Sequence, residues 1–163
     1  MLGITLFGLV HTLIAVFALG AGALCLATYH EITPRTASGR IYIGATVATC
    51  VTSLGIFHHG GFGKPHALAL LTLGVLAFCA WAGRQRLRRP WAATAEVIGY
   101  SFTVFLHMVP GITETFTRLP YGAPVFSSPE DPMLAKAVGG CFVIFVIGAL
   151  LQWRGLRLER AAR

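Results

Sequence analysis

Histidines are the residues of this chain best suited to chemistry, because imidazole binds transition metals and exchanges protons near neutral pH. The sequence contains 6 of them. Only His30 lies near one end of the apolar stretches, and the others lie near the opposite ends: His11, His58, His59, His66 and His107. Ionisable groups at membrane depth are costly and usually face the interior of a helical bundle. We therefore expect several of these imidazoles to converge on one site.

Helical spacing indicates which histidines face that interior. In the first apolar stretch, His11 shares a helix face with small residues, namely Ala15, Ala18, Gly22 and Cys25. Small residues let membrane helices approach closely, so His11 is expected on the packed side. In the second stretch a similar face contains Ala45, Ala48, Thr52 and Gly55. That face favours His59 over His58 as the inward residue.

A second polar pattern follows the fourth apolar stretch. Its members recur at intervals of three or four residues: Glu96, Tyr100, Thr103, His107, Pro110 and Glu114. On a helix, Glu96 and His107 would lie about 16 Å apart along the axis. If the helix continues beyond a kink at Pro110, Glu114 and Arg118 can form an ion pair one turn apart. The pattern, with Tyr100 inside it, predicts a proton path or a lid over the histidines.

Three kinds of chemistry fit this arrangement. Haem b would be held by two imidazoles from facing helices, drawn from His11, His59, His66 and His107. Copper or zinc would use the same cluster but needs three or four donors at the metal. A proton relay between Glu96 and Glu114 is the third. A non-catalytic structural or assembly subunit with incidental histidines remains the alternative, and the sequence does not decide whether the chain is an enzyme.

The composition places these residues in a membrane. Of the 163 residues, 55% are hydrophobic and only 12% are charged, and the mean hydropathy is +0.70. A soluble domain has roughly a quarter of its residues charged. The formal charge of +7 lies in short connections between apolar runs, where membrane topology explains it better than nucleic-acid binding does. No Walker-type phosphate loop, G-x-S-x-G elbow or H-E-x-x-H helix is found in the sequence.

A membrane span needs about 20 mostly apolar residues. The sequence predicts an all-α bundle, a single domain of five transmembrane helices over residues 2–29, 41–57, 65–83, 91–110 and 133–153, with an outer loop over 111–132. The first stretch is too long for the apolar region of a signal peptide. Each of the 4 cysteines lies in a different stretch, which argues against a disulfide framework.

The basic residues orient the predicted bundle. With five spans, ten of the 13 Lys and Arg residues share one face: Arg35, Arg40, Arg84, Arg86, Arg88, Arg89, Arg154, Arg157, Arg160 and Arg163. The positive-inside rule then predicts an N-out, C-in protein of the bacterial inner (plasma) membrane. The expected partners are the lipid bilayer and either quinone, a larger membrane complex or a second copy of the chain.

Short motifs in residues 8–110 resemble a family of small, uncharacterised bacterial polytopic membrane proteins of unknown function. The resemblance is carried by His11 in a Gly/Ala-rich first stretch, by Gly39-Arg40-Ile41-Tyr42 and by His66. The IFHH…KPHALALL pattern around His58, His59 and His66 is also similar to His-rich membrane proteins linked to haem–copper oxidase assembly. Both resemblances imply a helical membrane protein and raise the expectation of haem or metal, and neither supplies an established reaction.

Overall fold

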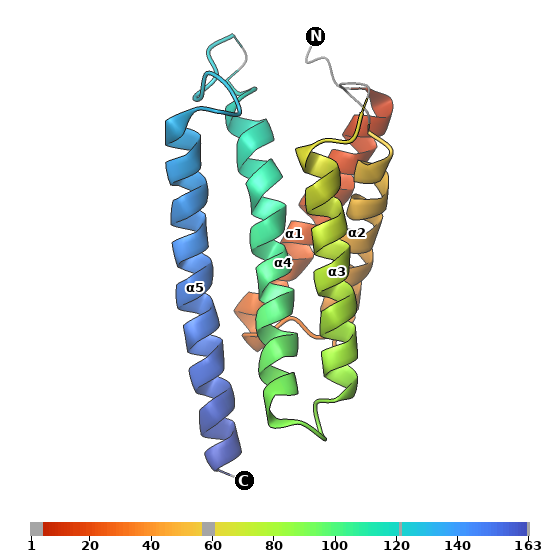
Figure 1. Ribbon diagram of the computed structural model, residues 1–163, viewed down its shortest axis with the longest axis vertical. Coiled ribbons are helices and arrows are strands. Elements are labelled where there is room, and N and C mark those ends of the chain that lie inside the picture. Colours follow the sequence, from red (N-terminus) through yellow and green to blue (C-terminus); the bar gives the residue numbers. More distant parts are fainter. Residues whose placement is uncertain (1–4, 57–60, 121, 163) are drawn as a thin grey trace.

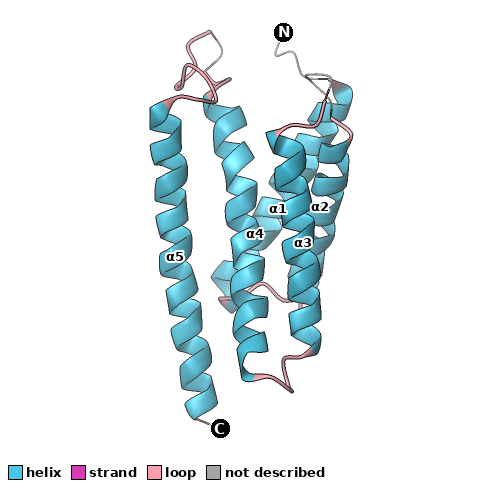
Figure 2. Cartoon of the chain, viewed as in Figure 1, coloured by secondary structure: helices cyan, strands magenta, loops and turns pink. Residues whose placement is uncertain are grey.

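The computed structural model describes residues 5–56, 61–120 and 122–162, and these residues form five helices and no strand. The helices are α1 (Leu6–Tyr29), α2 (Ala37–Leu54), α3 (Lys64–Arg84), α4 (Pro90–Phe116) and α5 (Pro132–Ala161) (Figures 1 and 2). The all-α prediction is confirmed. Four of the described helices, α1, α3, α4 and α5, are long and apolar enough to cross a membrane.

Consecutive helices run antiparallel and pack side by side (Figure 1). The start of α1, the end of α2, the start of α3 and the described part of the α4–α5 loop lie at one end of the bundle, which we name the histidine end. The α1–α2 connection, the α3–α4 connection and the end of α5 lie at the other, which we name the arginine end. Each predicted apolar stretch therefore corresponds to one helix of a single bundle.

Local sequence signals set where the helices begin. The Thr5 and Thr36 hydroxyls accept hydrogen bonds from the Gly8 and Gly39 N–H groups, each at 3.1 Å, and thereby cap α1 and α2. Proline lies in the first turn of α3, α4 and α5, where its missing N–H costs nothing.

The helix ends differ from the predicted spans in three places. Helix α4 passes through Pro110 to Phe116, so the continuation beyond this proline is confirmed and the loop is shorter than predicted. Helix α5 continues to Ala161, through an arginine-rich segment beyond residue 153 where the predicted span ended. Helix α2 is shifted toward the N-terminus because the Thr36 cap starts it before Ile41.

Small residues allow the helices to pack closely around the interior. Ala18, Gly22 and Cys25 of α1 are buried, which confirms the predicted small-residue face. A Cβ at Gly22 would lie 2.9 Å from the ring of Tyr42, so glycine at this position lets the fully buried tyrosine lie against α1. The predicted inward face of α2 is only partly correct. Its deepest side chains are instead Tyr42, Thr46, Thr49 and Cys50.

Helix α5 lies apart from this interior. Among the described helices it packs against α4 alone, mainly through phenylalanine rings at 5.3–6.0 Å. Only Leu134 and Leu156 of α5 are buried, and most of its large apolar side chains are exposed on the outer surface. A hydrogen bond also connects α5 to the end of α1, since Gln152 Nε2 donates to the His30 carbonyl at 2.8 Å.

Candidate functional site

Four side chains on one face of α4 form a polar seam through the bundle interior: Glu96, Tyr100, Thr103 and His107. All four are buried, with exposed fractions of 1%, 2%, 0% and 7%. At the middle of the seam, the Tyr42 and Thr103 hydroxyl oxygens lie 2.7 Å apart. The Thr103 hydroxyl already donates its hydrogen to the Tyr100 carbonyl at 2.7 Å. Tyr42 must therefore be the donor to Thr103, and this bond joins α2 to α4.

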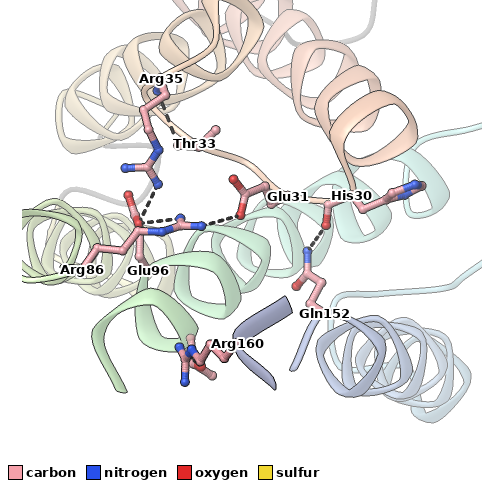
Figure 3. Close-up of polar contacts among 9 residues, drawn as sticks. His30, Glu31, Thr33, Arg35, Arg86, Glu96, Gln152 and Arg160 are labelled. Carbon is pink, nitrogen blue, oxygen red and sulfur yellow. Dashed lines mark hydrogen bonds and ion pairs between the residues drawn. The ribbon is translucent and has the colours of Figure 1, made fainter. Parts of the chain in front are cut away.

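At the arginine end, the buried Glu96 carboxylate binds two guanidinium groups. Its Oε2 atom lies 2.8 Å from Arg35 Nη2 and 3.0 Å from Arg86 Nη1. Arg86 also reaches Glu31 at 3.5 Å (Figure 3). Glu96, Arg35, Arg86 and Glu31 together carry two positive and two negative charges. They connect the α1–α2 and α3–α4 connections to the first turns of α4. Each buried or half-buried charge in this cluster has a partner of opposite sign.

Two local features make room for this cluster. Ile32 and Thr33 of the α1–α2 connection are buried, so the connection is inserted into the end of the bundle and carries Arg35 with it. A Cβ at Gly83 of α3 would lie 2.6 Å from Glu96 Oε1, so the absence of a side chain at Gly83 provides the space for the carboxylate. Charge patterning had assigned Arg35 and Arg86 only to membrane orientation and did not identify them as partners of Glu96.

At the histidine end, hydrogen-bond geometry assigns the tautomer of His11. Its Nδ1 atom lies 2.8 Å from the Thr52 hydroxyl oxygen. The single hydroxyl hydrogen of Thr52 is directed to backbone carbonyls of its own helix, at 2.9 Å from Ala48 and 3.0 Å from Thr49. Thr52 can therefore only accept, and the donor must be His11 Nδ1–H. The lone pair of a neutral His11 then lies on Nε2.

His107 lies on α4 at the same end of the bundle. Its ring is close to the backbone of Thr103, one helical turn earlier, and to His11. Its Nε2 atom is buried without a hydrogen-bond partner among the described residues. The structure thus places two imidazoles from α1 and α4 near each other, one bonded through Nδ1 and the other with a buried Nε2 that has no partner among the described residues.

His66 differs from these two histidines. It is buried at the start of α3, and its Nδ1 atom accepts a hydrogen bond from the Gly63 N–H at 3.1 Å. A neutral imidazole that accepts at Nδ1 carries its proton on Nε2, so Nε2 of His66 is a donor and has no lone pair for a metal. The Phe62 ring lies 5.2 Å from the His66 ring. In this geometry His66 fixes the start of α3.

The remaining histidines lie elsewhere. His58 and His59 fall outside the described residues. His30 ends α1 at the arginine end, with a left-handed φ of 57°. Among the described residues no three His, Cys, Asp or Glu side chains come together as a metal-binding group, and the four cysteines are free.

The predicted ion pair at the far end of α4 is confirmed, with Arg118 Nε 2.7 Å from Glu114 Oε2. Glu114 also lies within electrostatic range of His11. The α4–α5 loop folds onto the end of α4, where the Phe126 N–H donates to the Phe116 carbonyl at 3.0 Å. An exposed contact of 3.8 Å between Glu130 and Lys64 connects the loop to α3. A closing movement over the histidines stays a prediction.

No protein-family model, curated protein or solved structure matches this chain.

Proposed function

We propose that this chain is a small b-type cytochrome-like membrane protein that binds haem b through His11 and His107 and takes part in electron transfer. One observation carries the proposal: histidines from two different helices lie near each other at the histidine end, with His11 Nδ1 hydrogen-bonded to Thr52 and the buried His107 Nε2 without a hydrogen-bond partner among the described residues. Metal-binding histidines are commonly oriented as His11 is, because an acceptor at the second nitrogen fixes the tautomer and the ring orientation.

The number of donors favours haem over a bare metal ion. A haem macrocycle supplies four of the iron's ligands, so the protein needs to provide only two imidazoles. Copper or zinc needs three or four protein donors. The described residues contain no group of three such donors, so a copper or zinc site would have to recruit His58 and His59 from outside them.

The surrounding residues have defined roles in this proposal. The Thr52 hydroxyl accepts from His11 Nδ1–H and so orients that ring, and the Thr103 backbone lies beside the His107 ring. Haem would supply the one-electron redox chemistry. Glu114, paired with Arg118 and within electrostatic range of His11, provides a negative charge that would stabilise a positive charge at the site.

The proposal includes five membrane spans, with α2 as the fifth. Helix α2 lies between α1 and α3, and two of its threonines satisfy their hydroxyls on carbonyls within the helix, Thr49 to Ala45 and Thr52 to Ala48, each at 2.9 Å. Internal satisfaction of this kind makes threonine acceptable in lipid. With five spans, the arginine end faces the cytoplasm of a bacterium and the histidine end faces out across the inner membrane.

Cysteine labelling in intact cells tests the orientation, in a variant without the native cysteines. Ala123→Cys in the α4–α5 loop should react with a membrane-impermeant maleimide, and Leu87→Cys should react only after the cells are opened. Gly122 is less suitable because its φ is 85°. Leu87 is 98% exposed in the α3–α4 connection, so its protection in intact cells would reflect the membrane and not burial. The reverse labelling pattern would contradict N-out, C-in.

A visible spectrum of the purified protein tests the haem proposal. We expect a Soret band and an α band in the reduced state, and we expect His11→Ala or His107→Ala to remove or strongly weaken them. His30→Ala and His66→Ala are the matched controls and should retain the bands, because His30 lies at the other end and His66 holds its proton on Nε2.

The other outcomes separate the alternatives. Bound copper or zinc without a chromophore would support a metal-handling protein. Neither metal nor chromophore would support a structural or assembly subunit. Loss of the bands in His66→Ala but not in His107→Ala would show that the ligand assignment is wrong.

A further inference from the structure

A groove on the outer surface at the arginine end is distinct from the histidine site. Helix α4 forms its floor, and α3 and α5 form its two walls without packing against each other. Its volume is ≈ 660 Å³, and its lining is mostly apolar, with Phe78, Ile98 and Phe145 among the contributing side chains. Volumes of about 300–1,000 Å³ are typical of ligand-binding pockets.

The sequence of α4 explains where the groove lies. Its floor contains Ala95 and Gly99, which are small and lie one turn apart. Larger side chains flank them along the helix, with Trp91 toward the arginine end and Phe102 toward the bundle centre. Since α5 contacts α4 mainly through phenylalanines, it stands away from α3 and leaves this space between them.

The mouth of the groove at the arginine end is polar and positively charged. Arg160 of α5 lines it, and its Nη2 atom donates to the Thr94 hydroxyl at 3.3 Å. Arg160 forms no ion pair with a carboxylate of the described residues, in contrast to Arg35 and Arg86. The exposed Arg88 and Arg89 directly precede Pro90, which also lines the groove.

The first turn of α4 adds to this positive potential. The N-cap residue Arg89 makes no capping hydrogen bond through its side chain, and the first turn contains no acidic residue. The positive end of the helix dipole therefore lies at the groove mouth without a negative side chain to balance it. Trp91 on α4 and Trp153 on α5 also line the groove, and tryptophan is enriched where membrane proteins meet lipid headgroups.

We propose that this groove binds an anionic phospholipid, with an acyl chain between α3 and α5 and the phosphate at Arg160. An apolar channel that ends at an unpaired guanidinium matches the two halves of such a lipid. The guanidinium fork is suited to phosphate oxygens, and each basic residue near an anionic membrane surface contributes about 1 kcal/mol of attraction. The inference is independent of haem binding and of the orientation of the chain.

Fluorescence quenching in reconstituted vesicles tests this proposal. The chain has 3 tryptophans, and all lie beside the groove, since the Trp81 and Trp91 rings are 5.5 Å apart and Trp91 and Trp153 line it. Brominated phosphatidylglycerol and brominated phosphatidylcholine would be compared as quenchers at low mole fraction in phosphatidylcholine vesicles. We expect about 5-fold stronger apparent binding of the anionic lipid, the ratio that about 1 kcal/mol gives.

Two variants and one control decide the outcome. Arg160→Gln should abolish the preference for the anionic lipid, and Ala95→Phe should reduce quenching by both lipids because it fills the floor. Arg154→Gln, on the same helix but outside the groove lining, should retain the preference. Equal quenching by both lipids, or equal losses in Arg160→Gln and Arg154→Gln, would overturn the proposal. Selective protection by added quinone, or dimerisation that Ala95→Phe abolishes, would also overturn it and assign the groove to another occupant.

Discussion

Both ends of the polar seam bury an ionisable group in the bundle interior, but the two groups differ in their partners. At the arginine end, Glu96 is 1% exposed and its carboxylate receives two guanidinium groups. At the histidine end, His107 is 7% exposed and its Nε2 atom has no hydrogen-bond partner among the described residues. A buried polar atom without a partner is costly and usually indicates a ligand or a mechanism. Under the proposed function, the arginine end stabilises the fold and the histidine end binds the haem.

The largest expected effect follows from breaking the arginine end. Glu96→Ala leaves Arg35 and Arg86 without the carboxylate that binds both. Removing one partner of a buried ion pair typically costs about 3–5 kcal/mol. Because the Arg35 side chain is 48% exposed and can turn to water, we expect the lower part of that range. Unfolding of the detergent-solubilised protein in denaturant measures it.

A matched control for this prediction is Glu159→Ala, which removes an exposed carboxylate from α5 and should change the unfolding free energy by less than about 0.5 kcal/mol.

Any haem spectrum should survive in the fraction of Glu96→Ala that remains folded. If Glu96→Ala were as stable as the parent protein but lost its chromophore, the roles assigned to the two ends would have to be exchanged.

A smaller effect is expected from crowding the same carboxylate. Gly83→Ala adds a Cβ that would lie 2.6 Å from Glu96 Oε1, so the Glu96 side chain must move away from its arginines. Overpacking of this kind typically costs about 1–3 kcal/mol. Gly74→Ala on the same helix has no heavy atom within 4 Å of the new Cβ, and alanine favours helix by up to about 1 kcal/mol. The two variants should therefore change the unfolding temperature in opposite directions, and a shared direction would contradict the account of Gly83.

Sequence periodicity predicted the parts of the seam that belong to one helix. The spacing of Glu96, Tyr100, Thr103 and His107 places them on one face because the helical repeat is local and regular. The small-residue face of α1 was predicted for the same reason. The extension of α4 past Pro110 was predicted because Glu114 and Arg118 continue the spacing.

The pairings between helices could not be predicted in the same way. Arg35 and Glu96 are 61 residues apart in sequence, and Glu31 and Arg86 are 55 apart. No local pattern selects them from the other arginines of the same end. The prediction for α2 was only partly correct because its buried face is set by contacts with other helices, such as the bond of Tyr42 to Thr103 on α4, which the spacing of small residues does not reveal. The proton position on His66 depends on the Gly63 N–H, which only the folded chain places beside it.

The smallest expected effect concerns an exposed carboxylate at the histidine end, and it sharpens the contrast with Glu96. Asp131 caps α5, and hydrogen bonds from the Met133 and Ser127 N–H groups lower the pKa of its carboxyl group below the usual value. A pKa that is lower in the folded state means that the ionised form stabilises the fold. That contribution is complete above the unfolded-state pKa of about 3.9, and it is lost as the pH falls through the lower folded-state value.

Asp131→Asn isolates this contribution, because asparagine can still accept a hydrogen bond at the N-cap but does not titrate in this range. The stability difference between the parent protein and the variant should be constant from about pH 7 to pH 5 and should shrink below about pH 4. Denaturant unfolding of both proteins at each pH measures it, and subtraction removes the titration of the other carboxylates. A difference that grows as the pH falls would mean that the folded state raises the pKa, which the two N–H donors to the carboxylate do not allow.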